Sequence, residues 1–415
     1  MTVATATHTV PEWGHLAIGE DGVSPNSAER LHALAQRETR RLRVPQPILT
    51  PTTKPSLHAG QVVGVLAVPG ETVEILPKIE GSEPAALRRA LTRMLAVAWG
   101  LPIADSESAL LATQRADLLE ILIRLFADRL LVAVRRGLPH RYRQREDDLQ
   151  FLRGRLDIPR QLARHTVRPD RLACRFEELS VDTPLNRVLK AAVARLASVS
   201  ASDTNLRRLA ELSARFEFVG RSSVPAREPV RLDRTNTAFH RLYQLARALL
   251  GREWQSTTSG ASEGFALLFP MNDLFEAFIG RTMRAALAPL SVHLQDSGNY
   301  ALEGNSERER LFALRPDIVV DGDIVIDTKW KQLKADEATL GVSQADVYQM
   351  LAYARAYQAR RLVLLYPWHS ELPNLGTLRR WKVPKSDTTF EIAVVDVGRP
   401  DAVGDTLRET VWRRA

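Results

Sequence analysis

The sequence predicts a multidomain α/β protein, and three patterns along its 415 residues lead to this fold class. Residues 1–82 contain short β-branched runs with turn signals between them, which indicates a small β-rich domain. Residues 83–260 place apolar side chains at helical spacing, which predicts a helical domain. Residues 261–415 alternate between helix and strand patterns, which is typical of an α/β domain.

Local patterns predict individual elements in the first two domains. Residues 61–68 and 73–76 flank Pro69-Gly70 and are expected to form a β-hairpin. Three helices are expected in the second domain, covering residues 84–98, 118–126 and 185–197. Residues 255–264 are small and polar, which indicates a linker or mobile loop before the third domain.

The composition is that of an ordinary soluble protein, with 45% hydrophobic and 26% charged residues. The net charge of +8 fits a polyanionic partner, but it fits a basic protein without such a partner equally well. The single cysteine, Cys174, excludes an internal disulfide and a thiolate metal cluster. Residues 1–10 lack a secretory signal and charges interrupt the apolar stretch 118–134, so we expect a cytoplasmic protein without a membrane span.

The segment of residues 135–145 is strongly basic and contains Tyr142 among its arginines. Such a segment either follows a phosphate backbone or forms a solvated loop, and the sequence leaves both interpretations open. The nine histidines lack zinc-binding spacing, and no serine has the His and Asp pattern of a serine hydrolase. Zinc sites and serine hydrolysis are therefore not expected.

The third domain is expected to hold two helices, at residues 272–287 and 343–359. Its strands are expected at residues 291–295, 312–320, 323–330, 362–366 and 390–397. Asp321-Gly322, between two of these strands, is the strongest short-range hairpin signal in the chain.

The strand of residues 323–330 carries charges where a covered sheet is normally apolar. Strand alternation places Asp327 and Lys329 on one face and Ile324 and Ile326 on the other. Two charged side chains in a strand covered by helices cost free energy unless they are paired or bind something. Asp327 and Lys329 are therefore candidate functional residues.

Asp317 lies on the neighbouring strand, and the turn decides whether it joins them. A strict two-residue turn at Asp321-Gly322 would place Asp317 opposite Ile326, on the wrong face. A three-residue loop with a left-handed residue places Asp317 opposite Asp327 instead. We predict this second register, or an equivalent bulge at Pro316.

Two carboxylates on adjacent strands form an oxygen-rich site suited to Mg²⁺ or Mn²⁺. Such a metal polarises a phosphate and lowers the pKa of a bound water, while Lys329 stabilises developing negative charge or orients the attacking water. Asp317, Asp327 and Lys329 therefore predict metal-dependent phosphodiester hydrolysis. The structural alternative is an ion-pair network at a sheet edge.

Pro316-Asp317, followed by Asp327-Thr328-Lys329, resembles the signature of the PD-(D/E)xK nuclease superfamily. This resemblance implies a restriction-endonuclease-like α/β domain with a mixed central sheet. It also implies roles for residues on the two neighbouring helices. Glu276 is expected to be a third metal ligand, with an ordinary helix-surface carboxylate as the alternative. Gln349 is expected to contact the attacking water or the DNA backbone.

Gln349 has neighbours on its own helix that point the same way. Asp346, Gln349 and Tyr353 share one face of the predicted helix, apart from its apolar residues. A solvated helix face is the structural alternative for all three.

Over most of its length the chain resembles the McrC family, the nuclease subunits of McrBC-type restriction systems directed at 5-methylcytosine. The segments that carry this likeness occur along the chain in the same order as in the family. They are Glu74-Ile75-Leu76-Pro77-Lys78, Leu152-Arg153-Gly154-Arg155-Leu156, Cys174, Asp182-Thr183-Pro184-Leu185-Asn186-Arg187 and residues 272–278.

The family resemblance implies a metal-dependent DNA endonuclease subunit that cuts when docked on a GTP-hydrolysing AAA+ McrB-like hexamer. In this class the ring recognises modified DNA and translocates, and this chain has no Gly-rich phosphate loop of its own. By analogy, residues 1–82 would dock on the ring and residues 261–415 would form the nuclease domain. The alternative is a non-catalytic DNA-binding adaptor that stimulates the partner's NTPase.

Overall fold

The structure is a computed structural model that describes residues 6–79, 83–100, 117–168, 170–250, 264–304 and 309–412. It has a mixed α/β fold with several sheets, as the sequence predicts. The chain forms two compact units, of which the first is Met1–Ile121 with Ser262–Ala415 and the second is Leu122–Ala261. Except for Gly264, the predicted linker at residues 255–264 lies outside the described residues.

A four-stranded sheet in the order β1-β6-β5-β10 forms the N-terminal part of the first unit. Strands β5 (Val62–Val68) and β6 (Glu71–Leu76) are antiparallel and confirm the predicted hairpin. Strand β1 (Ala6–Pro11) lies parallel to β6. The fourth strand, β10 (Phe265–Pro270), comes from the beginning of the third predicted domain and pairs with β5.

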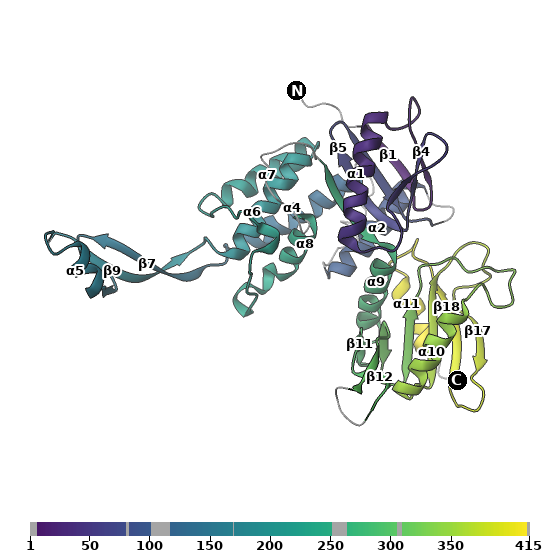
Figure 1. Cartoon of the computed structure of the whole chain (residues 1–415). Helices are drawn as coiled ribbons and strands as arrows, with labels where there is room; N and C mark the ends of the chain where they lie inside the picture. Colours follow the sequence, from purple (N-terminus) through teal and green to yellow (C-terminus); the bar gives the residue numbers. More distant parts are fainter. Residues whose placement is uncertain are drawn as a thin grey trace. The chain divides into compact units, whose positions relative to one another are not determined.

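Helix α1 (Pro25–Leu42) packs against this sheet and contributes Leu31 and Leu34 to its core (Figure 1). The side chain of Ser24 accepts a hydrogen bond from the Ser27 backbone N–H and begins the helix, with proline at its first position. The sequence-based description of residues 1–82 as β-rich missed this helix.

Three short strands and a helix complete the N-terminal region. Strands β2 (His15–Ala17), β4 (Ser56–Ala59) and β3 (Leu49–Pro51) form a small antiparallel sheet. Helix α2 (Pro84–Trp99) follows and ends at Gly100 in a left-handed conformation, as is common at helix C-termini. It confirms the helix predicted from residue 84.

Helices make up much of the second unit. They are α4 (Leu118–Arg135), which begins in the first unit, α6 (Pro184–Val199), α7 (Asp203–Arg215), α8 (His240–Leu250) and the short 3₁₀ segments η1 (Pro225–Arg227) and η2 (Arg234–Phe239). Helices α4 and α6 confirm two predicted helices. The core of this unit includes the buried side chains of Leu189, Leu196 and Leu245.

An antiparallel arm, residues 141–180, extends from the helices of the second unit (Figure 1). It consists of β7 (Arg141–Leu149), β8 (Arg155–Leu156), α5 (Ile158–Arg164) and β9 (Leu172–Ser180). The arm was not predicted: from Arg141 onward the basic segment is a strand, not a solvated loop. Cys174 is buried in it, as expected for a small apolar residue.

The arginines of β7 are engaged with acidic side chains. Arg141 pairs with Asp233 at 2.8 Å, Arg143 with Asp182 at 2.9 Å, and Arg145 with Glu178 at 2.8 Å. These ion pairs weigh against the interpretation of this segment as a track for a phosphate backbone, because their charges are already balanced.

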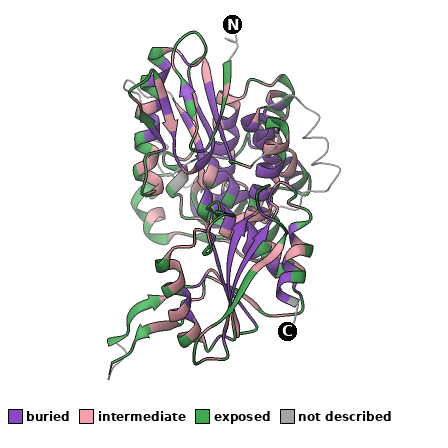
Figure 2. Ribbon diagram, turned by 90° about the vertical axis from the view of Figure 1, so that its right-hand side faces the viewer, coloured by how far each residue is buried: buried purple, intermediate pink, exposed green. Residues whose placement is uncertain are grey.

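A six-stranded mixed sheet forms the C-terminal part of the first unit, and Figure 2 shows its strands as largely buried. Its order is β11 (Val292–Leu294), β14 (Ile318–Val320), β15 (Ile324–Thr328), β16 (Arg361–Pro367), β18 (Thr389–Val395) and β17 (Gly376–Lys382). The three central strands β15, β16 and β18 are parallel, and the outer pairs are antiparallel.

Three helices accompany this sheet. Helices α9 (Met271–Ala286) and α10 (Gln344–Tyr357) confirm the two predicted ones, and α11 (Val403–Trp412) is additional. Helix α10 packs Met350 and Tyr353 into the same apolar cluster as Val319 and Val325 of the hairpin. This face of the sheet is therefore the one that α10 covers.

The strand predicted over residues 312–320 is wrong as a single element. β13 (Leu311–Leu314) pairs with β12 (Asn299–Leu302) in a separate two-stranded sheet, and β14 begins only at Ile318. Pro316 lies in the break, where a residue without an N–H group cannot donate to a ladder.

None of the helices in the described part of the chain combines the length and the apolar character that a membrane span requires.

Candidate active site

The predicted hairpin, β14 and β15, carries the candidate site. The strands are antiparallel with Ile318 opposite Ile326, and residues 321–323 form a three-residue loop whose first two residues have φ of +48° and +79°. Continued by one residue, this register places Asp317 opposite Asp327, so both side chains share the face covered by α10. The predicted register is confirmed.

Both carboxylates are withdrawn from water. Asp327 is only 2% exposed, and Asp317 is half-buried. The backbone N–H and the hydroxyl of Thr328 both donate to Oδ2 of Asp317, each at 2.7 Å. These two bonds fix one oxygen of the Asp317 carboxylate and orient the group.

The proximity of the carboxylates perturbs their protonation. Burial, reinforced by the negative charge of Glu276, raises the pKa of Asp317 to about 6. Burial, reinforced by the charge of Asp317, raises the pKa of Asp327 to about 6 as well. Two buried carboxylates that repel each other lack sufficient positive charge, and a cation bound between them would relieve this repulsion.

Lys329 provides part of that positive charge. Its Nζ lies 2.8 Å from Oδ2 of Asp327 and 3.4 Å from Oδ1 of Asp346, and it donates to Oε1 of Gln349 at 3.3 Å. Burial acts to lower the pKa of Lys329, but the neighbouring carboxylates, Asp327 first, leave that pKa above its ordinary value. The ammonium group is therefore held charged beside Asp327.

Gln349 and Tyr353 of α10 connect this lysine to the backbone between β13 and β14. Gln349 donates from Nε2 to the Tyr353 hydroxyl at 2.8 Å, and that hydroxyl donates to the backbone carbonyl of Arg315 at 3.0 Å. The chain of hydrogen bonds ends two residues before Asp317. Helix α10 thus fixes both Lys329 and the approach to Asp317.

Glu276 of α9 is linked to the other predicted site residues indirectly, through Gln295. Gln295 donates its side-chain amide to Glu276 Oε1 at 2.8 Å and its backbone N–H to the Asp317 carbonyl at 2.8 Å. The backbone of Gln295 is left-handed, with φ of +49°. Burial raises the pKa of Glu276, and the charges of Asp273 and Asp327 add to this rise.

The donor set suits a hard divalent cation, although it is not a closed cage. In the part of the chain that the structure describes, no three His, Cys, Asp or Glu side chains are grouped as a ready-made metal site. Asp317 and Asp327 nevertheless offer two carboxylates with raised pKa values on one face. Mg²⁺ is commonly held by one or two carboxylates and keeps several waters, so these residues fit such an ion.

The structure brings four of the five predicted site residues together. Asp317, Asp327, Lys329 and Gln349 lie in one connected group, and Glu276 joins it through Gln295. Sequence reasoning did not assign a role here to Thr328, Asp346 or Gln295. Asp346 had a usable signal, because it precedes Gln349 by one helical turn on the same face.

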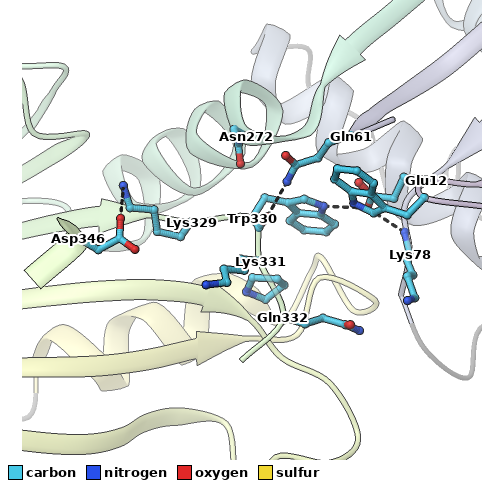
Figure 3. Close-up of a pocket in the computed structure, with 11 residues that line it drawn as sticks. Glu12, Gln61, Lys78, Asn272, Lys329, Trp330, Lys331, Gln332 and Asp346 are labelled. Atoms are coloured by element: carbon cyan, nitrogen blue, oxygen red, sulfur yellow. Dashed lines mark hydrogen bonds and ion pairs between the residues drawn. The ribbon is translucent and has the colours of Figure 1, made fainter. Parts of the chain in front are cut away.

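Trp330, directly after Lys329, is held by the N-terminal region (Figure 3). Its indole N–H donates to Oε1 of buried Glu12 at 2.8 Å, and its backbone carbonyl accepts a hydrogen bond from Gln61 at 2.7 Å. The ring also packs against Phe275, with ring centroids 5.4 Å apart. Trp330 therefore packs between Glu12 of the N-terminal region and Phe275 of α9.

Comparisons with known proteins identify relatives of the chain. The profile of the McrBC 5-methylcytosine restriction system component family matches residues 57–367. A chain in the Thermococcus gammatolerans half-complex of McrB AAA+ hexamers with bound McrC shares 22% identity, with a TM-score of 0.72 over 98% of this chain and 99% of that one. A chain in the McrBC complex of the same organism shares 25% identity, with a TM-score of 0.55 over 68% and 88%. No curated protein matches the sequence significantly.

Proposed function

The chain belongs to the McrBC family of 5-methylcytosine restriction system components, and from this premise we propose that it is the DNA-cutting subunit of such a system. Its activity would be metal-dependent hydrolysis of DNA phosphodiesters, performed when it is docked on a GTP-hydrolysing AAA+ hexamer related to McrB. The observation that carries the proposal is the opposition of Asp317 and Asp327 on one sheet face, with Lys329 2.8 Å from Asp327.

Each residue of the site has a task that its surroundings support. Asp317 and Asp327 would hold Mg²⁺ or Mn²⁺, and the bound ion would supply polarisation of the phosphate and a more acidic water. Lys329 would stabilise, through its ammonium group, the negative charge that develops on the phosphate. Asp346 and Gln349 orient Lys329, and Thr328 orients Asp317. Glu276 is the third carboxylate within electrostatic reach.

Substitution of Asp327 tests this proposal in the assembled complex. Asp327→Ala removes one of the two opposed carboxylates, and we expect DNA cleavage to fall by at least about a thousandfold. The rate is measured on methylated plasmid DNA with the chain, its ring partner, GTP and Mg²⁺. Asp387→Ala is the control, because Asp387 is fully exposed and lies outside the site. Chelation of the metal by EDTA should also abolish cleavage, but unlike Asp327→Ala it should stop GTP hydrolysis by the ring as well.

The same experiment separates the nuclease from the adaptor alternative. An adaptor would stimulate the partner's GTPase without cutting, and its function would not depend on Asp327. If the complex with Asp327→Ala still cleaved DNA, this chain would not be the nuclease. Retained stimulation of GTP hydrolysis with loss of cleavage is the result expected of a cutting subunit that still docks.

The arm is the surface best suited to docking on a ring. Near its far end it exposes apolar side chains, namely Phe151, Leu152, Ile158, Leu162 and Val167. Exposed apolar groups concentrated in one segment of the chain are typical of protein interaction sites. We therefore propose that the arm makes the docking contact, and docking through residues 1–82, which the family analogy implies, is the alternative.

A further inference from the structure

A second feature lies beside the candidate active site, within the same compact unit. It is a cavity of about 500 Å³ between the N-terminal region and the end of β15 (Figure 3). Trp330 forms a wall of it, fixed by Glu12 and Gln61. Lys329 and Asp346 line the cavity as well, so it adjoins the ion pair of Lys329 with Asp327.

The cavity is positively charged at its rim. Three lysines line it: Lys78, Lys329 and Lys331. Lys78 and Lys331 are exposed, and Lys331 donates to the backbone carbonyl of Gly341 at 2.9 Å. The two acidic residues in the lining are engaged, because Glu12 accepts from Trp330 and the Lys78 backbone, and Asp346 pairs with Lys329.

Trp13 brings an aromatic surface to this basic rim. It is 40% exposed and lines the cavity. Gly14 N–H donates to the Pro11 carbonyl, and within this turn Trp13 has φ of +62°, a conformation that glycine or asparagine usually supplies. His58 lies near its ring, with centroids 6.1 Å apart. A bulky residue held in a strained turn at a cavity mouth is typical of functional sites.

We propose that this cavity binds one unpaired nucleotide of the DNA strand next to the scissile phosphate, with its base stacked on Trp13 and its phosphates neutralised by Lys78 and Lys331. Proteins bind single-stranded nucleic acid through two main interactions, base stacking on aromatic rings and contacts of lysine or arginine with phosphates. A cavity of this volume admits a group of the size of a nucleotide but not a base-paired helix. The inference rests on the proposed nuclease function and names where its substrate lies.

Binding in EDTA tests the cavity without any cleavage. The probe is a fluorescein-labelled single-stranded oligonucleotide, titrated with the full chain and followed by anisotropy. We expect Trp13→Ala to weaken binding by about tenfold or more and Trp13→Phe to restore most of it. The control is Trp381→Ala, since Trp381 is 42% exposed on β17 and does not line the cavity.

The lysines predict a separate signature in the salt dependence. Removing one lysine that neutralises a phosphate should reduce the slope of log affinity against log salt by about 0.7 for a single strand. We expect this change for Lys78→Ala and Lys331→Ala, but not for Lys54→Ala, an exposed lysine outside the cavity. These variants decide the question even if Trp13→Ala fails to fold, as judged by circular dichroism.

Three outcomes would overturn the inference: no binding by the wild type, unchanged binding by the Trp13 and lysine variants, or loss of ring association with DNA binding intact. The last would make the cavity a protein-docking site. Failure of the nuclease proposal is distinguishable, because it appears as cleavage by Asp327→Ala, whereas the oligonucleotide measurement contains no cleavage step.

Discussion

At the scale of single residues, Glu12 links the N-terminal region to the candidate active site. It is 2% exposed, and it accepts hydrogen bonds from the Trp330 indole and from the Lys78 backbone N–H. Burial raises the pKa of Glu12 to about 7, against an ordinary value of 4.5, although these hydrogen bonds act to lower it. The folded protein therefore favours the protonated carboxyl.

This shift predicts a pH dependence of stability that Glu12→Gln removes. A carboxyl whose pKa is raised on folding stabilises the protein fully below its unfolded pKa of 4.5, and this contribution is lost as the pH rises through about 7. Between pH 5 and pH 8 the unfolding free energy of the wild type should fall by about 2–3 kcal/mol relative to Glu12→Gln. Urea unfolding at both pH values measures this, with exposed Glu371→Gln as the control. Parallel pH profiles for wild type and Glu12→Gln would contradict it.

Residue-level prediction from the sequence worked where the decisive interactions are local. Asp317 and Asp327 are joined by one hairpin, so turn length and strand alternation sufficed to place them on one face. The hydrogen bond from Gln61 to the Trp330 carbonyl joins residues far apart in sequence, and no local pattern reports it. The same holds for Gln295, whose role depends on a left-handed backbone within a short connection.

At the scale of elements, Gly64 decides whether β10 can join the N-terminal sheet. Its φ is +130°, and a Cβ at this position would lie 2.0 Å from the backbone carbonyl oxygen of Leu267 in β10. The two strands therefore approach each other more closely than any side chain at this position would permit. This pairing ties the start of α9 to the sheet, because α9 follows β10 directly.

Substitutions at two glycines of the β5–β6 hairpin should consequently differ in cost. Gly64→Ala requires a backbone shift as well as a strained φ, and we expect it to lower the unfolding free energy by about 3 kcal/mol or more. Gly70→Ala in the turn has a φ of +84° but open space around it, so we expect a loss of about 1 kcal/mol. Denaturant unfolding of both variants compares them. Equal losses of unfolding free energy would show that the close approach of β10 to Gly64 does not add to the cost of the substitution.

Elements were predictable from the sequence when their pattern is contiguous and undisturbed. The α9 and α10 helices and the β5–β6 hairpin have such patterns. Helix α1 has a serine N-cap, a proline at its first position and an apolar face that includes Leu31 and Leu34, so its sequence contained a helix signal that the description of residues 1–82 as β-rich did not use. The arm strands alternate paired charges instead of apolar and polar residues, so they lack the usual strand pattern.

At the scale of the whole molecule, catalysis and docking are assigned to different compact units. The carboxylates and Lys329 belong to the first unit, whereas the arm belongs to the second. The apolar side chains near the far end of the arm are exposed, so changing them removes nothing from the core beneath the carboxylate site. Docking and DNA binding should therefore be separable by substitution.

The double variant Phe151→Ser with Leu162→Ser tests this separation. Both side chains are exposed near the far end of the arm, so their loss leaves no cavity in the core. If the arm docks on the AAA+ ring, removal of two apolar anchors should weaken association by about a hundredfold or more. Analytical ultracentrifugation with the ring partner measures the affinity, and Val132→Ser, an exposed apolar residue of α4, is the matched control. Oligonucleotide binding should remain at the wild-type level, whereas undiminished ring association would return the docking role to another surface, with residues 1–82 the first to test.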